Sequence, residues 1–137
     1  EGQLEVFKEQ IKLAEEFNRP LNIHALKADG WLADLWPQMP ERFMLHSFGG
    51  SVDFLRSALK AGARISLSAS ILKHKNYADV IREVPLSKLL LESDGPFLSD
   101  YKDIPEFARK VAELKKIDYA ELVECVYANF REFNGGE

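Results

Sequence analysis

The sequence predicts an α/β fold of parallel β/α units, and two observations favour it. A helical segment comes first, and four short apolar segments then alternate with further helical ones. Strands that alternate with helices of this length pair in parallel through right-handed crossovers. No linker, low-complexity stretch or internal repeat divides the chain, so residues 1–137 are expected to form one unit.

The first element is a predicted helix over residues 3–18. Leu4, Phe7, Ile11 and Ala14 share one stripe of this segment, and charged residues occupy the opposite side. This spacing is typical of an amphipathic helix that packs its apolar stripe against a core.

Four strands are predicted after this helix, and all have polar residues near their carboxyl ends. Their sequences are LNIHA, RFMLHSF, ARISLSAS and KLLLESD, at residues 21–25, 42–48, 63–70 and 88–94. Alternate residues of a strand point to opposite faces, so each strand has one apolar face and one face that turns polar at the end. Ligands of parallel α/β folds bind at that end of the strands.

The helices between and after the strands are predicted from signals at their ends. These signals are Pro37 and Pro40 after a partly helical stretch, Ser51 and Gly62 around residues 49–62, Pro85 after residues 75–84, Pro105 at the start of the next helix, and the capping-box-like pair Asp118 and Glu121 at the start of the last.

Composition and charge argue against a purely basic nucleic-acid-binding protein and against a membrane-spanning protein. The formal net charge of −4 leaves no basic groove that would bind a phosphate backbone through Lys and Arg alone. An acidic protein still handles phosphates when a bound cation supplies the positive charge. The single Cys125 excludes an internal disulfide and indicates a reducing compartment, and no apolar run is long enough to span a membrane. We therefore expect a cytoplasmic protein without a membrane partner.

Two histidines and an aspartate occupy equivalent ends of three predicted strands. They are His24, His46 and Asp94. Imidazole and carboxylate together suit a divalent transition metal, which would neutralise the carboxylate charge. Glu92 precedes Asp94 by two residues and is a second ligand, a proton acceptor or a residue that orients a ligand. One strand-end histidine alone would indicate an ordinary hydrogen-bonded residue, but three such residues together favour a metal site.

The Lys-rich segment LKHKNY gives a weaker signal. His74 in this segment is expected to be a solvated loop residue. Lys73 and Lys75 are candidates for contact with a substrate phosphate, although a charged loop is usually only solvated. Trp31 and Trp36 flank an amphipathic stretch and are expected to pack rather than to stack on bases.

Several segments together resemble the TatD family of metal-dependent deoxyribonucleases, which are amidohydrolase-like barrels. The similar segments are RPLNIHA, HSFGGS, the Lys75–Asn76 pair, VPLSKLLLESDGPFL and YANFREFNG. They span nearly the whole chain, and LLLESDGPF is the most specific of them. Two segments differ from the family pattern: Leu26 replaces an arginine, and a short SDYKDIP replaces a longer loop. Both differences lie where a substrate phosphate would be held.

The resemblance implies an activity and a set of site residues. It implies that His24, His46 and Asp94 bind one or two divalent metal ions (Mg, Mn or Zn), with Glu92 beside them. Asp94 and Glu92 would act in catalysis, and Lys75 would contact the substrate. The implied reaction is hydrolysis of a phosphoester bond in nucleic acid or in a small phosphoester.

The chain is too short to form the whole barrel that the resemblance implies. A (β/α)8 barrel needs about 250 residues, and this chain has 137. The resemblance places residues 1–137 as the carboxyl-terminal half of such a barrel, with four strands and the helices outside. We expect activity only with the missing amino-terminal half or a second copy. The alternatives are an amidohydrolase-like enzyme for a small ester, lactone or amide, and a catalytically silent scaffold such as an open flavodoxin-like sheet.

Overall fold

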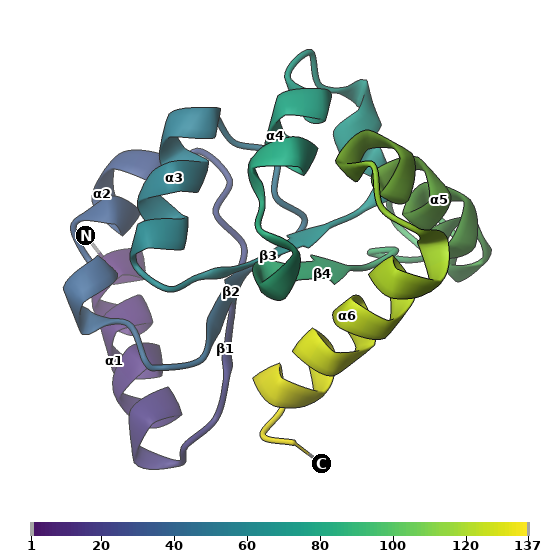
Figure 1. The fold of residues 1–137 in the computed structure, drawn as a ribbon. Helices are drawn as coiled ribbons and strands as arrows, with labels where there is room; N and C mark the ends of the chain where they lie inside the picture. Colours follow the sequence, from purple (N-terminus) through teal and green to yellow (C-terminus); the bar gives the residue numbers. More distant parts are fainter. Residues whose placement is uncertain (1, 137) are drawn as a thin grey trace.

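One parallel sheet runs through residues 2–136, the part of the chain that the computed structural model describes (Figure 1). Its strands are β1 (Leu21–Ile23), β2 (Phe43–Leu45), β3 (Arg64–Leu67) and β4 (Leu89–Leu91). They lie in the sheet in chain order, and each pairs in parallel with the next. The α/β class and the parallel pairing are therefore confirmed.

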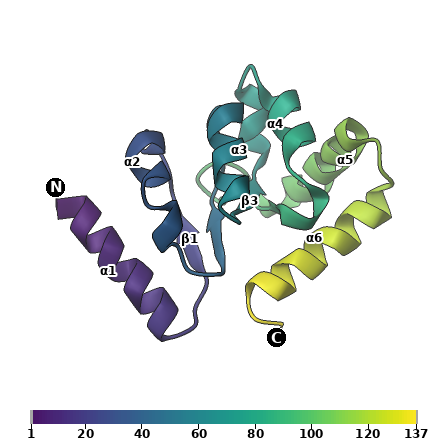
Figure 2. The ribbon, with the colours of Figure 1, turned by 60° about the vertical axis from the view of Figure 1, so that its left-hand side comes forward.

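The helices surround this sheet in an arc (Figure 2). They are α1 (Gly2–Glu16), α2 (Asp29–Ala33), α3 (Val52–Lys60), α4 (Tyr77–Glu83), α5 (Ile104–Lys115) and α6 (Tyr119–Phe133). Short 3-10 turns cover residues 36–38, 69–73, 86–88 and 101–103. Both views place α1 at one end of the arc and α6 at the other.

Most of the predicted helix ends are confirmed. The Ser51 hydroxyl caps α3 by accepting a hydrogen bond from the Phe54 amide, and Gly62 has a φ of +99° just after this helix. Asp118 caps α6 by accepting from the Ala120 amide at 2.8 Å.

The reciprocal half of the predicted capping box at α6 is wrong. Within residues 2–136, the Glu121 side chain makes no bond back to the Asp118 amide, and the Asp118 side chain caps the helix through the second helical amide. A full capping box forms instead between Asp100 and Asp103, in the turn that leads into α5.

The core lies between the sheet and the helices. The strand residues that point outward are almost fully buried, namely Ile23, Phe43, Leu45, Ile65, Leu67 and Leu89. They pack against α3, α4 and α5 through residues such as Leu55, Ile81 and Val111. Alternation along the strands therefore predicted correctly which face the helices cover.

Polar contacts close the edge of the sheet where the strands begin, which we call the amino rim. Buried Arg64 lies 2.9 Å from Glu132 of α6, and its guanidinium stacks over the Phe133 ring at 5.7 Å. Arg42 donates to the Phe133 carbonyl at 3.1 Å. Asn129 donates to the carbonyls of Leu86 and Leu89, at 2.7 and 2.9 Å. These bonds hold α6 against the sheet.

No helix within residues 2–136 combines the length and the apolar content that crossing a lipid bilayer requires.

Candidate active site

The strands are shorter than predicted, and the candidate site residues follow directly after them. We call this edge of the sheet the carboxyl rim. His24 follows β1, His46 follows β2, and Glu92 and Asp94 follow β4. The chain leaves the sheet here because Ser47 and Asp94 have left-handed φ angles of 44° and 53°. Residues other than glycine rarely adopt this conformation, and where they do they tend to lie at functional sites.

Three of the predicted residues meet at this rim. The ring centroids of His24 and His46 are 5.7 Å apart. The His46 Nε2 atom lies 3.4 Å from the Asp94 Oδ1 atom. The two histidines and the aspartate therefore lie on the same side of the molecule, as a shared site requires.

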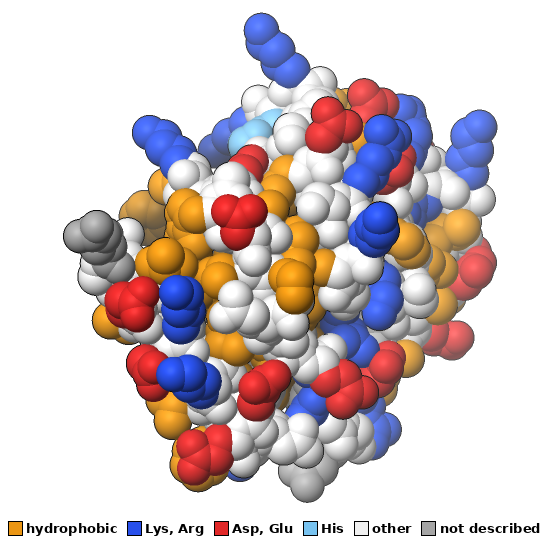
Figure 3. Space-filling view, turned by 90° about the vertical axis from the view of Figure 1, so that its left-hand side faces the viewer, with side chains coloured by type: hydrophobic (Ala, Val, Ile, Leu, Met, Phe, Trp, Pro, Cys, Tyr) orange, Lys and Arg blue, Asp and Glu red, His pale blue; other side chains and the backbone are white. Residues whose placement is uncertain are grey.

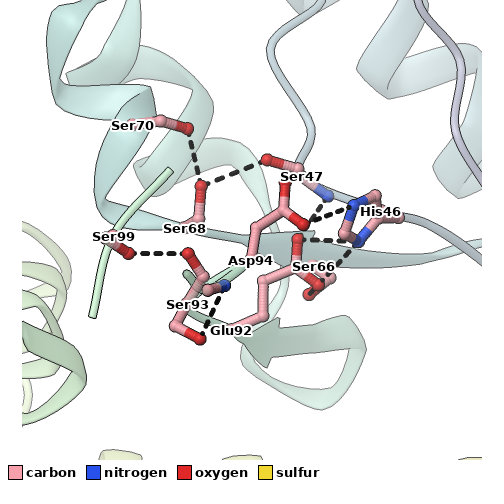
Figure 4. Close-up of polar contacts among 10 residues, drawn as sticks. His46, Ser47, Ser66, Ser68, Ser70, Glu92, Ser93, Asp94 and Ser99 are labelled. Carbon is pink, nitrogen blue, oxygen red and sulfur yellow. Dashed lines mark hydrogen bonds and ion pairs between the residues drawn. The ribbon is translucent and has the colours of Figure 1, made fainter. Parts of the chain in front are cut away.

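Glu92 holds the opposite edge of the His46 ring (Figure 4). The His46 Nδ1 atom is 3.0 Å from each Glu92 carboxylate oxygen. The Ser47 amide donates to one of these oxygens and the Ser66 hydroxyl to the other, both at 2.6 Å. Three donors therefore surround one carboxylate, and this arrangement fixes the His46 ring. Of the roles open to Glu92, the geometry fits an orienting residue best.

The contact with Glu92 determines what the other side of the His46 ring can bind. An ionised carboxylate only accepts hydrogen bonds, so the Nδ1 atom of His46 carries a proton, and in the neutral imidazole the Nε2 atom then presents a lone pair. That lone pair faces the Asp94 carboxylate oxygen at 3.4 Å. Two acceptors at this distance repel each other unless a cation lies beside both. The donor chemistry of the site therefore fits a cation.

The donor set of the described chain is nevertheless incomplete. Within residues 2–136, no group of three or more His, Cys, Asp or Glu side chains is arranged to hold a metal ion by itself. His24, His46 and Asp94 supply suitable ligand types for part of a coordination shell.

Buried serines support the rim from below. Ser66 and Ser68 are each only 1% exposed. The Ser47 and Ser68 hydroxyls are 3.1 Å apart, and the Ser68 and Ser70 hydroxyls are 2.6 Å apart (Figure 4). The alternation along β3 identified Ser66 and Ser68 as polar and inward, but not their contacts. Ser47, whose amide donates to Glu92, is the site residue that the sequence did not reveal.

A second set of hydrogen bonds shapes the turn that carries Asp94. The Ser99 hydroxyl donates to the Ser93 carbonyl at 2.6 Å, and the Gly95 amide donates to the Ser93 hydroxyl at 3.1 Å. The Leu98 amide donates to the Asp94 carbonyl at 3.1 Å. This local network stabilises the left-handed backbone at Asp94.

A cavity of about 1110 Å³ opens above these residues, and we call it the site cavity. His24, His46 and Asp94 form part of its wall. The loops after all four strands contribute to the rest, and two exposed apolar side chains, Leu26 and Phe97, are among the lining residues.

Of the two lysines that the sequence offered for contact with a substrate phosphate, only Lys73 lines the site cavity. Lys27, Lys73 and His74 line the cavity. Lys75 is exposed and is not among the lining residues. His74 is exposed, as expected for a loop residue, but it faces the cavity rather than open solvent alone.

Comparison with known proteins gives consistent matches. The family model described as "TatD related DNase" matches residues 1–135. The chain is 34% identical over 95 residues to the deoxyribonuclease Tat-D of Schizosaccharomyces pombe, a match that covers 66% of this chain and 30% of that relative. It is 26% identical over 138 residues to an uncharacterized metal-dependent hydrolase of Methanocaldococcus jannaschii, covering 96% of this chain and 55% of the relative.

Solved structures give the same picture for the fold. The crystal structure of a TatD family hydrolase from Entamoeba histolytica superposes with a TM-score of 0.86 at 18% sequence identity. The superposition covers 98% of this chain and 57% of that one. The chain thus has the fold of about half of such a barrel, and its matches cover between 30% and 57% of these relatives.

Proposed function

This chain belongs to the TatD-related DNase family, and from that premise we propose that it supplies the carboxyl-terminal half of a metal-dependent phosphoester hydrolase. The observation that carries the proposal is the position of His46 between Glu92 and Asp94 at the strand ends. The relatives named as a deoxyribonuclease and a metal-dependent hydrolase support nucleic acid as the substrate. They do not favour the alternatives of a small ester or amide substrate or a silent scaffold.

We assign His24, His46 and Asp94 as ligands of one or two divalent cations (Mg, Mn or Zn). All three line the site cavity, and the facing lone pairs of His46 and Asp94 support the assignment. A bound divalent cation polarises a phosphoryl oxygen and lowers the pKa of a bound water toward about 7.

The side chains of this chain have separate tasks in the proposal. Asp94 accepts the proton of the attacking water, because its carboxylate faces the site cavity. Glu92 keeps the His46 ring in place, since both of its oxygens already accept hydrogen bonds. Glu92 is therefore a positioning residue. Lys75 remains the predicted contact for a substrate phosphate, and the single Cys125 is the reason to propose a reducing, cytoplasmic compartment.

We also propose that the missing amino-terminal half, or a second copy, completes the barrel. Both β1 and β4 are edge strands with unpaired backbone groups. The end helices expose apolar side chains: Val6 and Leu13 on α1, with Phe17 just after it, and Val123, Tyr127 and Phe130 on α6. Figure 3 shows hydrophobic side chains grouped between charged ones on the face at the α1 end. Exposed apolar groups at both ends of an arc suit closure by further β/α units.

The test is metal-dependent cleavage by the completed protein. The chain is combined with a separately expressed amino-terminal half from the same family, and cleavage of labelled single-stranded DNA is measured with Mn²⁺ and with EDTA. Asp94→Asn is expected to lower the Mn²⁺-dependent rate by about 100-fold or more. Asp53→Asn, in the exposed first turn of α3, is the matched control. An unchanged rate in Asp94→Asn contradicts the proposal.

A further inference from the structure

The loops after β2 and β3 approach each other closely at Gly49, where the His74 ring occupies the space that a side chain would need. A Cβ atom at Gly49 would lie 2.7 Å from the His74 Cε1 atom and 3.2 Å from its Nε2 atom. Contacts below 3.0 Å force one partner to move, so any other residue at this position would displace the His74 ring. The Asn76 side chain also donates to the Gly50 carbonyl at 3.2 Å. Gly49 therefore locates His74.

The position of His74 is on the wall of the site cavity. Its neighbour Lys73 lines the same wall, and Lys27 lines it from the loop after β1. Among the ion pairs formed by residues 2–136, none includes Lys27 or Lys73. The cavity thus has basic side chains free to meet an anion, in a protein whose formal net charge is −4.

We propose that His74 and Lys73 form an anion subsite that holds a backbone phosphate of a nucleic-acid strand, next to the phosphate at His46 and Asp94. Gly49 is its positioning residue. An imidazole N–H and an ammonium group both donate to phosphate oxygens, and such charge-assisted bonds are among the stronger ones. The position of the cleaved phosphate rests on the proposed function. Binding of a phosphate at His74 does not depend on it, because it needs neither metal nor cleavage.

The test measures binding without metal. The full 137-residue chain is titrated into a fluorescein-labelled strand of four thymidylates in EDTA, and fluorescence anisotropy gives the affinity. His74→Ala is expected to weaken binding about tenfold, the usual effect of losing a hydrogen bond to a charged group. Lys60→Gln, on the exposed end of α3, is the matched control and is expected to leave the affinity unchanged.

A double-mutant cycle then tests the role of Gly49. Because Gly49→Ala acts by moving His74, it is expected to weaken binding as much as His74→Ala, and the double variant no further. Additive losses, or no loss in His74→Ala, overturn the inference, as does a wild-type chain that does not bind the strand. Where Gly49→Ala fails to fold, Lys73→Gln replaces it, with an expected reduction of about 0.7 in the salt slope.

Two further measurements distinguish a specific phosphate contact from general ionic attraction, and failure of this subsite from failure of the proposed function. Inorganic phosphate is expected to displace the strand from the wild-type chain more strongly than sodium chloride at equal ionic strength; equal displacement overturns a specific phosphate contact. Cleavage that depends on Asp94 together with binding that does not depend on His74 refutes this subsite alone. Binding that depends on His74 without metal-dependent cleavage refutes the proposed function alone.

Discussion

The polar side chains at the two rims of the sheet have opposite kinds of neighbours. At the amino rim, each cation meets an acceptor: Arg64 lies beside Glu132, and Arg42 donates to the Phe133 carbonyl. At the carboxyl rim, the His46 Nε2 atom, an acceptor in the neutral ring, lies 3.4 Å from the Asp94 carboxylate. The first rim is closed by α6, and the second opens into the site cavity.

Polar contacts at the amino rim therefore stabilise the fold, whereas those at the carboxyl rim belong to the candidate site. An ion pair and hydrogen-bonded carbonyls at the amino rim stabilise the fold. Facing acceptors at the carboxyl rim leave a local excess of negative potential that a cation relieves. Barrels of parallel strands generally divide their two rims in this way.

The largest expected effect on stability is at the amino rim. Asn129→Ala removes the donor for the Leu86 and Leu89 carbonyls, so the free energy of unfolding is expected to fall by about 3 kcal/mol. Urea denaturation measures this change. Asn134→Ala, which removes an exposed bond to the Phe130 carbonyl, is the control and is expected to cost less than about 0.5 kcal/mol. Equal losses in both variants would show that α6 is not held by Asn129.

A cation is expected to stabilise the carboxyl rim almost as much. Mn²⁺ at 100 times its dissociation constant should raise the free energy of unfolding by about 2.7 kcal/mol, because it binds the folded state only. The measurement is thermal unfolding of the completed protein with Mn²⁺ and with EDTA. His46→Ala is expected to abolish the increase and Asp53→Asn to retain it. An unfolding temperature that does not respond to the metal would contradict a cation between the facing acceptors.

Removing the charge of Glu92 tests whether this residue orients His46. Glu92→Gln is expected to lower kcat of the completed protein by about 10- to 100-fold with little change in KM, as for other partners of metal ligands. Mn²⁺ affinity should fall by a similar factor, a change that a purely structural role would not produce. Glu124→Gln, on the exposed side of α6, is the control. A proportional rise in KM instead would place Glu92 in substrate binding.

The smallest expected effect is a pH dependence of stability that comes from a half-buried lysine. Lys115 of α5 donates to the Val84 carbonyl, and burial lowers the pKa of its ammonium group below the ordinary value of 10.5. The unfolded chain therefore binds this proton more tightly than the folded one. Stability is expected to rise with pH between the lowered pKa and 10.5, by less than about 1 kcal/mol because the side chain is only half-buried.

A pH series of urea denaturation curves checks this rise. Lys115→Met is expected to flatten it, since the substituted side chain has no proton to lose. A wild-type stability that falls over the same pH range would contradict the assigned direction.

Local sequence patterns predicted the parts of the fold that depend on near neighbours. The stripe over residues 3–18, the Ser51 cap and the Gly62 turn are all found in the structure. All four strands were predicted too long, and after β2 and β4 the backbone turns left-handed at Ser47 and Asp94, which no local pattern indicated. The capping box was expected at Asp118 and found at Asp100, since both segments carry acidic residues three apart.

By itself, the sequence determined the order of the strands and helices and placed His24, His46 and Asp94 at equivalent strand ends. Alternation along a strand is a property of the backbone, so a short segment is enough to determine it. The tertiary structure alone decided that Glu92 bonds to His46 and Ser66, and that His74 lies against Gly49. These partners are 46, 26 and 25 positions apart in the chain. Their contacts depend on how loops from different β/α units pack, which no local pattern encodes.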